Sequence, residues 1–145
     1  PMQKLQPAIK INASAELKEV GLEQLPSNLN EIAAQGRITL TASNGEEIEI
    51  KADNWSGFGK MFNKNVSYLL IDQSRIAATA LMEQSDTYKI SFYTDDNSKA
   101  SVVIECKKAM SQKMTAEELK SLNQNADTSK QYTMYIGEVT KTLMR

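Results

Sequence analysis

The stretch RITLTASNGEEIEIKA, residues 37–52, decides the fold, because apolar residues alternate with polar ones on both sides of a turn. A period of two is typical of a β-strand with one buried face. A three-residue turn at 43–45, with Gly45 at a positive φ, brings Leu40 opposite Ile48. A two-residue turn would set Leu40 opposite a glutamate, so the pattern predicts the longer turn and an antiparallel hairpin.

A second hairpin is predicted over residues 88–106, where two alternating segments flank a polar turn at 95–98. Phe92 can face Val102 in this hairpin. Single strands are predicted at 66–72 and 131–143. In the latter the apolar alternation changes parity at Gly137, which indicates a bulge. Residues 75–82 are predicted to form another strand, although their alanines also permit a helix.

Three helices are predicted around these strands. Ser14 is a suitable N-cap for a short helix that runs through Val20 and ends at Gly21. A second helix is predicted with Pro26 in its first turn and ends at Gly36, with apolar residues on one face. A third begins at Thr115, which has the spacing of a capping box with Glu118. The prediction is an α+β fold: a mainly antiparallel sheet of five to seven strands, with N-terminal helices and one late helix packed on it.

Length and composition predict a single domain over residues 14–145, after a lead-in of residues 1–13 whose Pro1 resembles a tag remnant. The chain has no histidine, which excludes serine–histidine and cysteine–histidine nucleophile pairs and the usual zinc and iron sites. A single cysteine and the absence of a signal-like apolar run favour a cytoplasmic protein. A net charge of −1 without a basic stripe argues against nucleic-acid binding, and no apolar run is long enough for a membrane span.

Three polar or reactive groups have ordinary structural explanations. Of the glutamates at 46, 47 and 49, Glu47 and Glu49 alternate with Ile48 and Ile50 and are expected to line the solvent face of a strand. The acidic cluster at 95–97 suits a solvated turn better than a cation site. Cys106 continues the apolar set of its strand and is expected to be a small buried hydrophobe. No catalytic residue and no metal ligand is predicted from them.

Residues 53–65 are the most suggestive stretch for function, because they combine aromatic side chains with glycines. We expect a loop here. Trp55, Phe58 and Phe62 offer flat apolar surface for a planar ligand or a protein partner, and Met61 is an adaptable neighbour. The competing interpretation is that these aromatics close one end of the sheet.

From residue 25 to residue 122, the order and spacing of these segments resemble the cytosolic haem-utilisation carriers, which are haem-trafficking domains with an α+β and often dimeric fold. The resemblance lies in RITLT (37–41) leading to IEIK (48–51), in LLIDQSRIA (69–77), and in ISFY (90–93) followed by ASVVI (100–104). It implies a haem-carrier-like fold and haem as the ligand. That family ligates iron through histidine, which is missing here, so the resemblance leaves Tyr68 as the candidate ligand.

Three hypotheses for function follow. The first is a non-catalytic binding domain that carries a planar apolar ligand of the haem type. The second is a protein–protein interaction module, such as a secretion chaperone, immunity protein or adaptor, and a homodimer fits either one. The third is an enzyme built on carboxylate or tyrosine chemistry. The first is preferred, with no cofactor other than haem.

Overall fold

The computed structural model describes residues 16–94, 99–122 and 129–145, which form an antiparallel sheet with two α-helices. The expected α+β class with a mainly antiparallel sheet is therefore observed, with eight strands instead of five to seven. The strands are β1 (Lys18–Val20), β2 (Arg37–Ala42), β3 (Glu47–Ile50), β4 (Trp55–Met61), β5 (Lys64–Asp72), β6 (Thr87–Tyr93), β7 (Val102–Thr115) and β8 (Gln131–Met144). The helices are α1 (Leu29–Gln35) and α2 (Ile76–Gln84), with 3₁₀ turns at Leu22–Gln24 and Ala52–Asn54.

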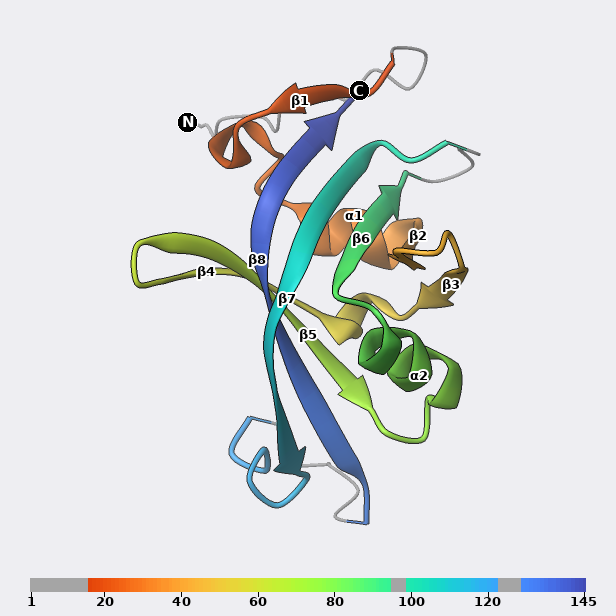
Figure 1. Ribbon diagram of the computed structural model, residues 1–145, viewed down its shortest axis with the longest axis vertical. Coiled ribbons are helices and arrows are strands. Elements are labelled where there is room, and N and C mark those ends of the chain that lie inside the picture. Colours follow the sequence, from red (N-terminus) through yellow and green to blue (C-terminus); the bar gives the residue numbers. More distant parts are fainter. Residues whose placement is uncertain (1–15, 95–98, 123–128) are drawn as a thin grey trace.

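Strands β7 and β8 are neighbours in the middle of the sheet, whose order is β3-β2-β6-β7-β8-β5-β4. Figure 1 shows them as two long twisted arrows, with both helices on one side and the β4–β5 hairpin projecting on the other. One edge of β8 pairs with β7 along its length, while the other pairs with β5 and then, near its end, with β1. The β4–β5 hairpin therefore reaches the rest of the sheet through β8.

The two predicted hairpins are confirmed in register as well as in position. Leu40 lies opposite Ile48, and Gly45 has φ +91° in a three-residue turn. Phe92 lies opposite Val102 in the β6–β7 pair. The polar turn of the second hairpin at 95–98 lies outside the described residues. Side-chain alternation was sufficient here because a slip of one residue would turn every apolar side chain toward water.

The second predicted helix is confirmed as α1, which ends at Gly36 and buries Leu29 and Ala33, but it begins at Leu29, so Pro26 lies before the helix and not in its first turn. The prediction of a strand at 75–82 was wrong, because α2 occupies this segment. Alanine is the best helix former, and in α2 the buried Ala78 pairs at helical spacing with Leu81. The alternative that the alanines left open is the one that the chain adopts.

The aromatic and glycine-rich segment was expected to be a loop, and this was wrong, since residues 55–61 form β4. The register of β4 against β5 shifts between Trp55 and Phe58, and Gly57 lies in the shift with φ +92°. A glycine at positive φ is what a β-bulge of this kind needs. The glycine that suggested a loop therefore serves a bulged strand.

The two other predicted helices were also wrong. Ser14 lies outside the described residues, but Lys18–Val20 is the short strand β1, which pairs with the end of β8. The capping-box bonds between Thr115 and Glu118 do form, at 2.9 Å and 3.1 Å to the two backbone N–H groups. They close only a series of turns, because Thr115 still pairs with Gln131 as the last residue of β7.

The parity change at Gly137 coincides with irregular pairing between β7 and β8. The register shifts between Lys108 and Met110, which leaves Ala109 of β7 unpaired beside Gly137, and again where Thr140 of β8 is skipped. The bulge predicted in the last strand at Gly137 was therefore misplaced: at that position the extra residue is Ala109 of the partner strand β7, and the bulge of β8 itself lies at Thr140. Such bulges increase the local twist and help this long pair to coil.

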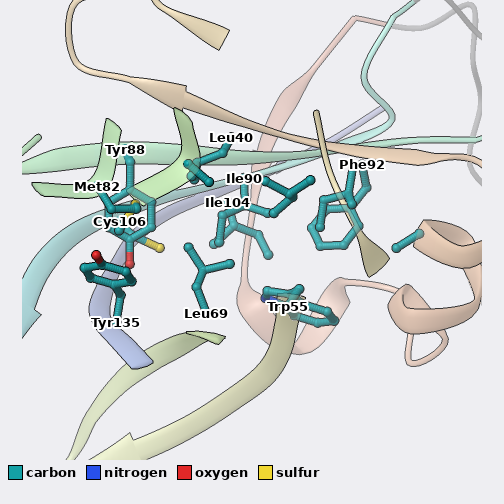
Figure 2. Close-up of a cluster of buried hydrophobic side chains, with 14 of the residues drawn as sticks. Leu40, Trp55, Leu69, Met82, Tyr88, Ile90, Phe92, Ile104, Cys106 and Tyr135 are labelled. Atoms are coloured by element: carbon teal, nitrogen blue, oxygen red, sulfur yellow. The ribbon is translucent and has the colours of Figure 1, made fainter. Parts of the chain in front are cut away.

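A continuous core joins the two helices to one face of the sheet. Its largest fully buried side chains include Tyr88, Phe92, Tyr135 and Met82. Figure 2 shows these side chains gathered with Leu69, Ile90, Ile104 and Trp55 between the strands. No helix among the described residues is long and apolar enough to cross a bilayer.

Candidate functional site

The aromatic residues at the start of β4 belong to the core side of the sheet. Trp55 is 4% exposed, and its indole Nε1 donates a hydrogen bond of 2.9 Å to the buried Ser67 Oγ. Its ring meets Phe92 at 5.1 Å and Phe58 at 5.3 Å between centroids, both edge to face. Phe58 is partly buried against the same core. These two predicted site residues therefore pack inside the domain.

The end of β4, unlike its start, carries apolar side chains that are exposed to solvent. Met61 is 37% exposed and Phe62 is 97% exposed at the tip of the β4–β5 hairpin. Tyr68 lies half-buried on β5, with its hydroxyl directly over Gly59 of β4. A side chain at position 59 would collide with that hydroxyl, which explains the glycine there.

A hollow of about 360 Å³ opens beside this hairpin, on the face of the sheet opposite the core. Its floor consists of Val66 and Ile136, which are 4% and 5% exposed and do not belong to the core cluster. Strands β4, β5, β7 and β8 all contribute to its lining, which consists of Met61, Phe62, Lys64, Val66, Ala109, Met110, Ile136 and Glu138. The unpaired Ala109 of the β7 bulge places Met110, which is 45% exposed, at the rim.

The charged groups of the hollow are one lysine and one glutamate. Lys64 Nζ lies 3.5 Å from Glu138 Oε2, with side-chain exposures of 65% and 37%. Both side chains are thus accessible to solvent and contribute little to stability as a pair. In an otherwise apolar lining, the Lys64 ammonium group can donate hydrogen bonds, and the neighbouring Glu138 carboxylate can accept them.

Of the five residues singled out in the sequence, the structure brings Met61 and Phe62 together in the hollow. Trp55 and Phe58 lie on the core side, and Tyr68 is not part of the lining. The floor and far wall come from Ile136, Met110 and other residues that sequence reasoning did not select. The sequence contained one indication of these residues, namely apolar side chains on the outward faces of two long strands. These side chains indicate a common site only when β7 and β8 are known to pair.

The other buried polar groups lie away from this hollow. Burial raises the pKa of the Cys106 thiol to about 12, and burial also raises the pKa of the neighbouring Tyr88. Burial, together with a hydrogen bond of 2.7 Å donated to Glu83 Oε2, raises the pKa of Tyr135. As expected from the strand pattern, Cys106 is a buried hydrophobe, 1% exposed. A second hollow of about 350 Å³ lies beside the turn that contains Gly45, and no site residue predicted from the sequence lines it.

Within the described ranges, no three cysteine or carboxylate side chains come close enough together to hold a metal ion. The expected acidic strand face is present, because Glu47 and Glu49 are exposed on β3. Glu47 accepts hydrogen bonds from Thr39 and Tyr93, at 2.7 Å and 3.1 Å. That carboxylate therefore has structural partners on the outer face of the sheet.

No family model and no curated protein matches the sequence. Among solved structures, the fold is similar to the flavin reductase of styrene monooxygenase from Pseudomonas putida S12, at 11% identity and a TM-score of 0.46, with 74% of this chain and 78% of that chain covered. It is also similar to a protein from Lactobacillus delbrueckii assigned as a pyridoxamine 5′-phosphate oxidase, at 8% identity, a TM-score of 0.49 and coverage of 86% and 98%. A third is the 2-nitrobenzoate 2-nitroreductase of Pseudomonas fluorescens, at 11% identity, a TM-score of 0.46 and coverage of 88% and 77%.

These neighbours correct the interpretation that the resemblance to haem-utilisation carriers suggested. The three similar structures are named as a flavin reductase, an oxidase and a nitroreductase, and none of them is named as a haem carrier. The haem-carrier resemblance, haem as the cofactor with Tyr68 as its ligand, and the non-catalytic carrier or adaptor function are therefore withdrawn. The short apolar strands that carried the resemblance occur in many antiparallel sheets, and so could not separate one such fold from another.

Proposed function

We propose that this chain binds the ring system of a flavin in the hollow beside the β4–β5 hairpin and belongs functionally with the oxidoreductases. The observation that carries the proposal is the hollow itself, an apolar recess of about 360 Å³ with one lysine and one glutamate at its edge. Sites for small planar molecules are of this kind: mostly apolar walls with a few polar groups that fix orientation. Flavin is chosen as the ligand class because the flavin reductase among the similar structures is named for that ring.

The residues of the hollow fit the chemistry of a flavin ring. The ring has two flat apolar faces and one polar edge, which bears carbonyl oxygens and an N–H group. Val66 and Ile136 supply an apolar floor for one face, with Met110 at the rim. The Lys64 ammonium would donate to a ring carbonyl, and the Glu138 carboxylate would accept from the ring N–H.

The same residues offer little to the phosphate of a flavin mononucleotide. Phosphate groups are held by arginine or lysine side chains or by a helix N-terminus, and the lining contains a single lysine already paired with Glu138. The charges of the lining therefore sum to zero. Recognition in this hollow would rest on the ring, and the ribityl phosphate would extend into solvent.

A bound flavin supplies the transfer of two electrons, for example by accepting a hydride from a reduced nicotinamide; that chemistry is the cofactor's own. The protein would contribute orientation and the exclusion of water. The floor residues would cover one face of the ring, and the lysine–glutamate pair would hold its polar edge. Because the chain contains no histidine, no imidazole takes part in proton transfer here.

The experiment is a titration of the purified protein with riboflavin, followed by flavin fluorescence, together with two matched variants. Met110→Lys places a charge at the rim of the hollow and is expected to raise the Kd about tenfold or more. Met114→Lys is the control, because Met114 lies on the same face of β7 but outside the hollow. Consumption of NADH in the presence of riboflavin is then measured with the same three proteins.

Saturable binding that Met110→Lys weakens and Met114→Lys leaves within about twofold would support the proposal. Absence of riboflavin binding by the wild-type protein at roughly 100 µM would refute it, since even a weak specific site should be detected there. If riboflavin binds but no flavin-dependent consumption of NADH is observed, flavin remains the proposed ligand and a reduced nicotinamide is rejected as the electron donor.

A further inference from the structure

The tip of the β4–β5 hairpin is a two-residue turn made by Phe62 and Asn63. Met61 pairs with Lys64, so only these two residues lie between the paired ends. Both have positive φ, 49° for Phe62 and 68° for Asn63. Two successive positive φ angles define the hairpin turn that favours Asn, Asp and Gly, because these residues tolerate the left-handed region.

Phe62 is poorly suited to this position for two separate reasons. Its Cβ and ring make the left-handed conformation unfavourable, and Phe62 and Asn63 are the only non-glycine residues with positive φ in the described part of the chain. The ring is also 97% exposed, so it gains almost nothing from burial within the chain. A strained backbone and an exposed large aromatic side chain together indicate a residue kept for a contact outside the fold.

The position of the ring indicates what that contact is. Phe62 lines the hollow whose floor is Val66 and Ile136. The floor is almost completely buried, whereas Phe62 at the rim is almost completely exposed, and within the described part of the chain its ring stacks on no other ring. A flat ligand on the floor would present its second face to solvent unless that ring covers it.

We propose that Phe62 is the stacking residue of this hollow and that the strained turn holds its ring where it closes over the outer face of a bound flavin ring. The inference rests on the proposed function and adds a specific residue to it. Aromatic rings stack favourably when offset, and stacking would remove from water the apolar surface that Phe62 exposes in the free protein. The strained turn would then lower the stability of the hairpin and raise the affinity for the flavin ring, and functional sites often show such an opposition between stability and activity.

This opposition gives a test with opposite signs for stability and binding. Phe62→Asn places a residue that favours positive φ in the turn and removes the ring. We expect its Tm to rise by about 2 to 4 °C and its riboflavin Kd to rise about tenfold. Asn63→Gly is the matched control: it should also raise the Tm, because glycine suits the second turn position, while the riboflavin Kd stays within about twofold.

A third variant reports the contact directly. Phe62→Trp keeps a stacking ring and places a fluorophore at the rim, so riboflavin is expected to quench the emission of this tryptophan in parallel with its own binding curve. The buried Trp55 gives the background emission in the wild-type protein, against which the new signal is measured.

Three outcomes would overturn the inference. If Phe62→Asn binds riboflavin as tightly as the wild type, the hollow binds flavin without a stacking residue, and only this inference fails. If the wild type binds no riboflavin, the proposed function fails and takes the inference with it. If sedimentation shows a wild-type dimer that Phe62→Asn dissociates, a second copy of the chain covers the ring and the stacking role is wrong.

Discussion

Gly137 in β8 offers the sharpest test of how the core is packed, because a side chain there would meet Tyr88. The Tyr88 hydroxyl occupies the place of the added Cβ, its Cζ would lie 2.9 Å from that Cβ, and the Cβ of Cys106 would lie 3.1 Å away. Tyr88 is 2% exposed and cannot move into solvent, and its hydroxyl has no hydrogen-bond partner among the described residues. In Figure 2 the Tyr88 ring points toward Tyr135 from above, next to Cys106.

The expected cost of Gly137→Ala follows from two opposing effects. Overpacking a rigid core costs about 1–3 kcal/mol. The backbone of Gly137 lies outside the left-handed region, so alanine is compatible with it and gains about 0.4–1 kcal/mol by restricting the unfolded chain. We therefore expect a net loss of about 1–2 kcal/mol in the free energy of unfolding.

Removing the hydroxyl should relieve part of this cost. Tyr88→Phe alone deletes a buried hydroxyl that has no partner, so we expect a change of less than about 1 kcal/mol, in the stabilising direction. In the Tyr88→Phe background, Gly137→Ala meets the ring at 2.9 Å instead of the hydroxyl, which leaves a smaller clash. The two substitutions should therefore be coupled by about 1 kcal/mol.

Urea unfolding of the wild type, the two single variants and the double variant measures this coupling. Effects that add to within about 0.3 kcal/mol would refute the reasoning, because they would show that the hydroxyl is not what excludes a side chain at position 137. Equal m-values in all four proteins are the control that the unfolded states are comparable.

Three further predictions concern the hairpin, the thiol and the hollow. Ser67→Ala leaves the buried Trp55 N–H without its acceptor and should cost about 1–3 kcal/mol in urea unfolding; a cost below about 0.5 kcal/mol would mean that another acceptor replaces the serine. With a pKa of about 12, only about one Cys106 thiol in ten thousand is ionised at pH 8, and the reactive fraction grows as the pH rises. Labelling of Cys106 with iodoacetamide should therefore require unfolding. Rapid labelling of the native protein would contradict this prediction. Riboflavin and its 5′-phosphate should bind within about threefold of each other, since Lys64 and Glu138 cancel in charge; a preference of about a hundredfold for the phosphate ester would point to a phosphate site elsewhere.

The sequence alone was sufficient where a local pattern left one physical solution. The register of the β2–β3 hairpin followed from the need to bury Leu40 and Ile48 on one face, and Gly45 supplied the backbone freedom that the turn requires. The end of α1 at Gly36 and the burial of Cys106 were fixed in the same way, by neighbours within a few residues.

Local patterns failed where two structures satisfied them equally well. Residues 75–82 permit either a strand or a helix, and the packing of Ala78, Leu81 and Met82 into the core selects the helix. The aromatic segment reads as a loop because of its glycines, yet pairing with β5 makes it a bulged strand. The Thr115 capping box forms its hydrogen bonds without a helix, since the end of β7 already holds that threonine.

For the candidate site, the sequence by itself identified a chain without histidine chemistry and an aromatic segment rich enough in apolar surface to bind something. It could not separate Trp55, which faces the core, from Phe62, which faces solvent, because Phe62 lies in the two-residue turn beyond the end of β4, where strand alternation no longer sets the side-chain direction. Only the tertiary structure decided where the hollow lies, since its floor joins Val66 to Ile136, 70 residues away along the chain, through the pairing of β5 with β8. Side-chain periodicity is a local property, whereas a binding site depends on which distant strands become neighbours.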